Sequence, residues 1–135
     1  MSEKTAPDVA TGKISLVLII SLNLMFVVSC ALCGDTLGSQ ATSPDGQVVA
    51  RVYERDCGAT TNFTTQVNVQ GSSVKFDATD GVIFGANGNH NVSVTWTGPR
   101  TLLVSCPSCL RRDVFLQVAV AANIDVKYTL AVDAR

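Results

Sequence analysis

The sequence has little charge of either sign and no excess of basic residues. Of its 135 residues, 16% are charged, and ten Lys and Arg against eleven Asp and Glu leave a formal charge of -1. A nucleic-acid-binding domain usually carries a basic stripe and has a pI above about 9. The charge balance therefore indicates no nucleic-acid partner, and the length allows one small domain.

Residues that usually perform catalysis are also scarce. His90 is the only histidine, and its small polar neighbours are typical of a solvated loop rather than of a catalytic or metal site. There is no glycine-rich phosphate loop and no Gly-x-Ser-x-Gly elbow. Glu54 and Asp56 would share one face of an extended segment, but the adjacent Arg55 favours a salt-bridged edge. We therefore predict no catalytic residue, no metal ligand and no cofactor, and an enzyme is the less favoured class.

One long uncharged apolar run stands near the N-terminus, at residues 14–33. A helix rises about 1.5 Å per residue, so this run would extend about 30 Å, the thickness of the hydrocarbon core of a bilayer. Lys13 precedes it, where the positive-inside rule places a cytoplasmic flank. The pattern predicts one N-terminal hydrophobic helix, with residues 1–13 in the cytoplasm.

Three interpretations of this run remain open. It could be a cleavable signal peptide, a single-pass transmembrane anchor or a lipoprotein signal. The last would end at Cys30, because Val27-Val28-Ser29-Cys30 loosely fits a sequence whose cysteine receives a diacylglycerol. Anchor and lipoprotein are equally favoured. All three interpretations associate the chain with the bilayer and place residues 34–135 outside the cytoplasm.

The rest of the chain has the patterns of short strands separated by turns. We expect a Gly/Ser/Thr-rich linker at residues 34–42 and a β-domain at residues 43–135, opened by a turn at Ser43-Pro44-Asp45-Gly46. Alternation predicts strands near residues 47–54, 64–70, 82–84, 91–96, 102–105, 114–121 and 124–132. The expected fold class is all-β, a small antiparallel sandwich or curled meander of six or seven strands. Trp96 and Phe115 are predicted to be core residues.

Five cysteines invite chemistry. Thiols outside the cytoplasm tend to pair, so an odd cysteine requires an explanation. If Cys30 is lipidated or lies in the anchor, four remain for disulfides, and the sequence leaves all three pairings open: Cys33, Cys57, Cys106 and Cys109.

The spacing Cys106-Pro-Ser-Cys109 is compatible with thiol-disulfide exchange. Dithiol oxidoreductases place the first cysteine at a helix N-terminus, which lowers the pKa of its thiol. Here a β-like segment follows instead, so a structural disulfide is favoured. A zinc site that also uses Cys30 and Cys33 is disfavoured, because thiolates outside the cytoplasm become oxidised.

Several motifs resemble those of a family of small uncharacterised bacterial envelope proteins. They are Cys33-Gly34-Asp35, the turn at residues 43–46, Arg-Asp-Cys-Gly-Ala-Thr-Thr at residues 55–61, and Thr65-Gln66-Val67. The resemblance covers about residues 14–70 and implies an envelope location, with no catalytic activity. It also implies that Cys33 pairs with Cys57, and a disulfide that closes this loop would stabilise the fold by roughly 3 kcal/mol. The pair Cys106 and Cys109 would then be a local addition or a second, short-loop disulfide.

Three functional hypotheses follow. The first is a membrane-tethered extracytoplasmic β-domain that acts as an interaction or structural module of the bacterial envelope, with an envelope protein as its partner. The second is an envelope thiol-disulfide protein that uses Cys106 and Cys109. A hydrolase or metal enzyme would need a group of catalytic residues that the sequence does not display. For the first hypothesis the candidate interaction loop is fixed by Cys57 and contains Asp56, Gly58, Thr60 and Thr61.

Overall fold

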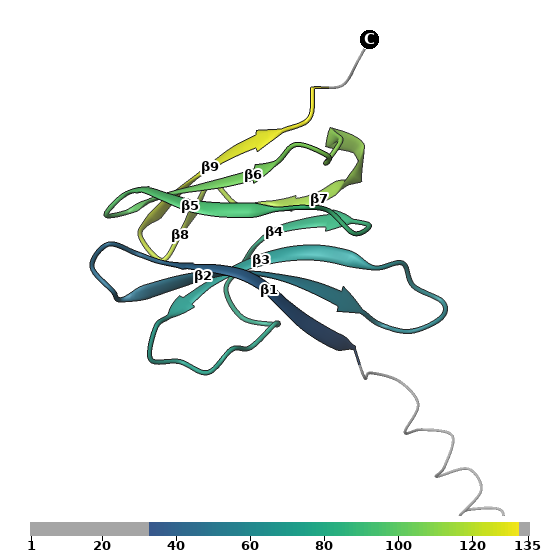
Figure 1. Ribbon diagram of the computed structural model, residues 1–135, viewed down its shortest axis with the longest axis horizontal. Helices are drawn as coiled ribbons and strands as arrows, with labels where there is room; N and C mark the ends of the chain where they lie inside the picture. Colours follow the sequence, from purple (N-terminus) through teal and green to yellow (C-terminus); the bar gives the residue numbers. More distant parts are fainter. Residues whose placement is uncertain (1–32, 133–135) are drawn as a thin grey trace, which may run out of the picture. The chain divides into compact units, whose positions relative to one another are not determined.

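The computed structural model describes residues 33–132, which form two packed β-sheets (Figure 1). The five-stranded sheet has the order β1-β2-β3-β4-β7 and the four-stranded sheet the order β5-β6-β9-β8. The strands of the first sheet are β1 (Gly34–Thr42), β2 (Val48–Asp56), β3 (Thr64–Gly71), β4 (Val82–Asn87) and β7 (Val114–Gln117). Those of the second are β5 (Ser93–Gly98), β6 (Thr101–Cys106), β8 (Val120–Ala121) and β9 (Ile124–Leu130). The prediction of an all-β fold is confirmed.

The described residues form nine strands rather than six or seven. The expected single strand at residues 114–121 is divided, because β7 pairs with β4 in one sheet and β8 with β9 in the other. The other additional strand is β1, which forms from the residues that were predicted to be a linker. The chain thus passes from one sheet to the other within a few residues of Gln117.

Strand β1 corrects the linker prediction for residues 34–42. It is an edge strand, paired antiparallel with β2 from Gly34↔Asp56 to Thr42↔Val49, with a bulge between Leu37 and Gln40. Nearly all of its residues are exposed, so neither face shows the apolar alternation that identifies a strand in a sequence. Pairing with β2 fixes its conformation.

The second sheet is mixed rather than antiparallel. Strands β6 and β9 run parallel, from Thr101↔Asp125 to Cys106↔Leu130. Parallel neighbours need a crossover connection. Here the chain between them contains the 3₁₀ turn η2 (Arg111–Asp113) and strands β7 and β8. Strand β7 joins the first sheet, and the chain then returns to the second sheet with β8.

The core lies between the two sheets and is built from alternating residues. Strand β6 shows this most clearly, since Leu102, Val104 and Cys106 are buried while the residues between them are partly exposed. The rings of Phe84 and Tyr128 stack at a centroid distance of 5.8 Å across the core. The other fully buried core side chains include Ala50, Val67, Ile83, Ala86, Cys109 and Ile124.

The two aromatic core predictions have different outcomes. Trp96 packs against the core, and its Nε1–H donates to the carbonyl of Ala41 at 3.0 Å. The prediction for Phe115 is wrong: 53% of the residue is exposed. On β7 the alternate residues, Val114 and Leu116, are the less exposed ones. Phe115 instead lies over Gly85, where an added Cβ would come within 2.4 Å of the ring.

Among residues 33–132, no helix is long and apolar enough to cross a membrane. The cytoplasmic segment predicted at residues 1–13, the hydrophobic helix up to Leu32 and the lipidation candidate Cys30 lie outside the described residues.

Candidate interaction loop and its disulfide-bonded base

The candidate interaction loop connects β2 to β3, and its own hydrogen bonds determine its shape. The N–H of Gly58 donates to Asp56 Oδ1 at 2.9 Å, and the N–H and hydroxyl of Thr61 donate to the Gly58 carbonyl at 3.0 and 3.1 Å. Gly58 has a φ of 103°, a conformation that favours glycine. Residues 57–63 are exposed. The predicted loop is therefore an ordered turn whose threonine side chains face solvent.

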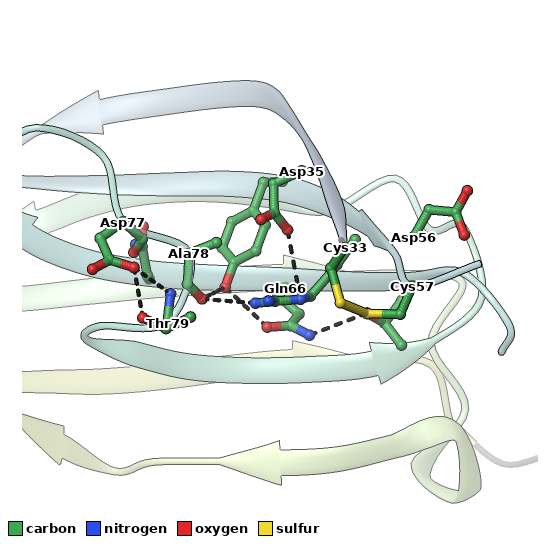
Figure 2. Close-up of polar contacts among 12 residues, drawn as sticks. Cys33, Asp35, Asp56, Cys57, Gln66, Asp77, Ala78 and Thr79 are labelled. Carbon is green, nitrogen blue, oxygen red and sulfur yellow. Dashed lines mark hydrogen bonds and ion pairs between the residues drawn. A yellow bond between two sulfur atoms is a disulfide. The ribbon is translucent and has the colours of Figure 1, made fainter. Parts of the chain in front are cut away.

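A disulfide fixes the base of this loop. Cys33 and Cys57, separated by 24 positions in the sequence, are bonded beside the first pair of the β1–β2 ladder, Gly34↔Asp56 (Figure 2). This is the pairing implied by the family resemblance. A second disulfide joins Cys106 and Cys109. All four cysteines predicted to form disulfides are therefore paired.

An ion pair lies next to the first disulfide. Arg55 Nε is 3.7 Å from Asp35 Oδ1, and each side chain is 21% exposed. Arg55 also donates from Nη1 to the Ala78 carbonyl at 3.3 Å. The predicted salt-bridged edge is present, but the carboxylate comes from β1 and not from the Glu54 and Asp56 pair. A partly exposed pair at this distance contributes well under about 1 kcal/mol, so the disulfide is the stronger constraint on the loop.

Tyr53 is buried under the β3–β4 loop, on the face of the first sheet that is turned away from the core. Its hydroxyl is 2.8 Å from the Ala78 carbonyl and 2.9 Å from Gln66 Oε1 (Figure 2). The ring of Phe76 meets it edge-on at 5.2 Å. Burial raises the pKa of Tyr53 to about 12. The β3–β4 loop thus covers what would otherwise be a solvent-exposed face.

Two buried amide side chains hold that loop in place. Asn68 Nδ2 donates to the carbonyls of Asp77 and Asp80 at 3.0 and 3.2 Å. Gln70 donates to the Asp77 carbonyl at 3.1 Å and accepts from the Asp77 N–H at 3.2 Å. Sequence reasoning missed both. The available signal was that polar positions of β3 carry uncharged amides, which can donate to the carbonyls of a covering backbone and, at Gln70, also accept from one of its N–H groups.

The two tyrosines of the chain permit a direct test of this burial. Burial also raises the pKa of Tyr128 to about 12, and its hydroxyl lies 2.8 Å from the carbonyls of Ile83 and Val118. We expect phenolate absorbance to appear near pH 12 in the folded chain and near pH 10 in denaturant. The pKa of each tyrosine is higher in the folded chain than in the unfolded chain. Its contribution to stability is therefore fully present below about pH 10 and is lost as the pH rises through 12.

The variants Tyr53→Phe and Tyr128→Phe should each remove half of the absorbance change. A folded chain that titrates near pH 10 would contradict the burial of both hydroxyls.

His90 is more constrained than a solvated loop residue. Its N–H donates to Thr65 Oγ1 at 2.9 Å, its Nε2 is 2.8 Å from the Asn87 carbonyl, and its Nδ1 is 3.1 Å from Ser108 Oγ. It also lines a pocket of about 400 Å³ together with residues of β1, β2 and β3. The structure therefore places the only histidine in a fixed orientation, half-buried, beside the second disulfide.

The second disulfide is buried in the folded domain. Cys106 and Cys109 are both fully buried, and the Cys109 N–H donates to the Cys106 carbonyl at 3.2 Å to close the turn between them. Thiol-disulfide exchange requires a thiolate to reach one of the sulfur atoms. Burial thus favours a structural role for this bond over an exchange reaction.

No protein-family model, no curated protein and no solved structure matches the chain.

Proposed function

We propose that this chain is a membrane-tethered protein whose β-sandwich lies outside the cytoplasm and serves as an interaction or structural module of the bacterial envelope. The tether is the uncharged run that begins at residue 14 and ends before Cys33, which is bonded to Cys57 in the sandwich, and a run of this length can span a bilayer. The motifs at residues 33–35 and 55–61 support the envelope location through their resemblance to bacterial envelope proteins.

The ordered, exposed loop at residues 56–61 carries the interaction part of the proposal. A loop already fixed by a disulfide and by its own hydrogen bonds loses little entropy when a partner binds. Phe63 follows the loop and is 52% exposed. An aromatic anchor beside hydroxyl groups is the composition of many protein-binding surfaces. The partner we propose is an envelope protein with an apolar pocket for Phe63 and polar groups around it.

Site-specific photo-crosslinking in cells tests this surface. With a photoreactive residue in place of Thr60, we expect a discrete adduct with one envelope protein, and Phe63→Ala should reduce the yield of that adduct. The matched control replaces Ser73, which is exposed on the β3–β4 loop, and should give no such adduct. Identical products from both positions, or none from Thr60, would contradict a role for the loop.

Intact mass of the membrane-extracted protein tests the tether. We expect either the full-length chain or a chain that begins at Cys30 and carries diacylglycerol and acyl mass. Cys30→Ser should release the protein from the membrane only in the second case. A chain that is recovered in the soluble fraction without lipid would contradict the proposal.

The alternative function is thiol-disulfide exchange, and the one observation that supports it is the position of His90 and Ser108 beside the second disulfide. Alkylation in a glutathione buffer, followed by mass measurement, separates the two functions. In that buffer a structural pair stays oxidised, whereas an exchanging pair would acquire two alkyl groups.

A further inference from the structure

The side chain of His90 meets the two cysteines of the Cys106–Cys109 turn. His90 comes from the β4–β5 connection, Cys106 ends β6, and Cys109 follows the two-residue turn. Both sulfur atoms and a ring nitrogen of His90 lie within 4.8 Å of one another. Histidine nitrogen and two thiolates are the ligands that Zn²⁺ prefers, and cysteines two residues apart are a common spacing in zinc sites.

The orientation of the imidazole is an independent indication of metal binding. The Asn87 carbonyl only accepts hydrogen bonds, so Nε2, 2.8 Å away, carries the proton. In the neutral ring the lone pair is then on Nδ1, where it can accept from the Ser108 hydroxyl 3.1 Å away. That hydroxyl is 3.8 Å from Cys106 Sγ, so the lone pair is directed toward the turn. A histidine that ligates a metal almost always donates its other N–H to a carbonyl or carboxylate, as this one does.

We propose that, once the Cys106–Cys109 disulfide is reduced, the two thiolates and Nδ1 of His90 bind one Zn²⁺ ion. A dithiol reductant supplies two electrons and two protons, which open the S–S bond and leave two thiols while the dithiol becomes a disulfide. Zn²⁺ then displaces both thiol protons and forms two Zn–S bonds and one Zn–N bond. Water or the Ser108 hydroxyl takes the fourth position.

After reduction, ligation requires the two sulfur atoms to separate and the ring nitrogen to approach them. In a tetrahedral site, ligand atoms lie about 3.6–3.8 Å apart, given Zn–S bonds of about 2.3 Å and Zn–N bonds of about 2.0–2.1 Å. At present the two sulfur atoms are bonded to each other, and the ring nitrogen lies within 4.8 Å of both. Two thiolates also neutralise the divalent ion, so a site among fully buried cysteines would carry no net charge. Oxidation consumes both thiolates, which makes the site dependent on redox state. The proposal does not depend on the interaction loop.

Metal titration of the detergent-extracted full-length chain tests the site. The chain is reduced with a phosphine, the free thiols are counted by mass, and Co²⁺ is added as the probe. We expect thiolate-to-cobalt charge transfer and a tetrahedral ligand-field spectrum at one ion per chain, with displacement by Zn²⁺. The oxidised chain should show neither. Should reduction alone abolish cooperative unfolding, Zn²⁺ must restore it.

Matched variants decide which residues bind. Cys33→Ser/Cys57→Ser should retain the cobalt spectrum, Cys106→Ser/Cys109→Ser should lose it, and His90→Gln should weaken Zn²⁺ binding by at least about 10-fold and alter the spectrum. The proposal is overturned if the reduced wild-type chain binds no Co²⁺, or if Zn²⁺ fails to restore cooperative unfolding that reduction abolished. It is also overturned by equal binding in the oxidised chain, by an unchanged spectrum in His90→Gln, or by loss of binding in Cys33→Ser/Cys57→Ser.

Discussion

Replacement of Cys57 by serine will lower the free energy of unfolding by about 2–5 kcal/mol, the usual cost of losing a native disulfide in a small domain. The bond closes a loop of 24 positions and is the covalent link between β1 and the base of the interaction loop. Chain entropy alone accounts for roughly 3 kcal/mol of this effect. In a domain of about 100 residues, each kcal/mol corresponds to about 4–8 °C in Tm. Calorimetry of the purified chain measures the change.

The matched variants are Cys33→Ser and the double variant. Cys57 is exposed and Cys33 only half-buried, so serine adds little packing cost at either position. Each single variant already loses the whole bond, and the double variant should therefore be no less stable than either. Additive losses would show that the two residues act separately, and an unchanged Tm would show that the bond does not constrain the unfolded chain.

Much of the fold could be predicted because buried strands leave a clear pattern. Ser43 to Gly46 form the expected turn, with the Gly46 N–H donating to the Ser43 carbonyl at 2.8 Å and Gly46 at a φ of 74°. Strand β6 alternates as expected. The polar edge strand β1 had no such pattern, since its conformation depends on pairing with β2. The parallel pairing of β6 and β9 is likewise a property of the tertiary arrangement, which no local pattern encodes.

The parts of the candidate sites that lie within one short segment of the chain could be predicted from the sequence. The motif at residues 55–61 located an ordered loop, because Asp56 and Gly58 form its turn within three residues. In contrast, His90 meets the Cys106–Cys109 turn across two sheet connections, and only the folded chain brings them together. The same holds for Asn68, whose role depends on carbonyls nine and twelve residues away.

Gly81→Ala should destabilise the chain by at least about 3 kcal/mol. Gly81 has a φ of 66°, which costs other residues about 1–2 kcal/mol. In addition, a Cβ here would meet the Val69 carbonyl oxygen in the adjacent strand at 2.1 Å. The backbone cannot retreat freely, because the Val69 N–H donates to the Gly81 carbonyl at 2.9 Å. Denaturant unfolding measures the loss as a shift in midpoint.

Gly46→Ala is the matched control, because its φ of 74° is similar but no atom lies within 4 Å of an added Cβ. It should cost only about 1–2 kcal/mol, and equal losses in the two variants would exclude the steric contribution at Gly81. Tyrosine titration then shows where the strain is released. If the β3–β4 loop lifts from the sheet, Tyr53 will titrate near pH 10 while Tyr128 still titrates near 12. If both remain near 12, the strain is distributed through β3 and β4 and the cover over Tyr53 persists.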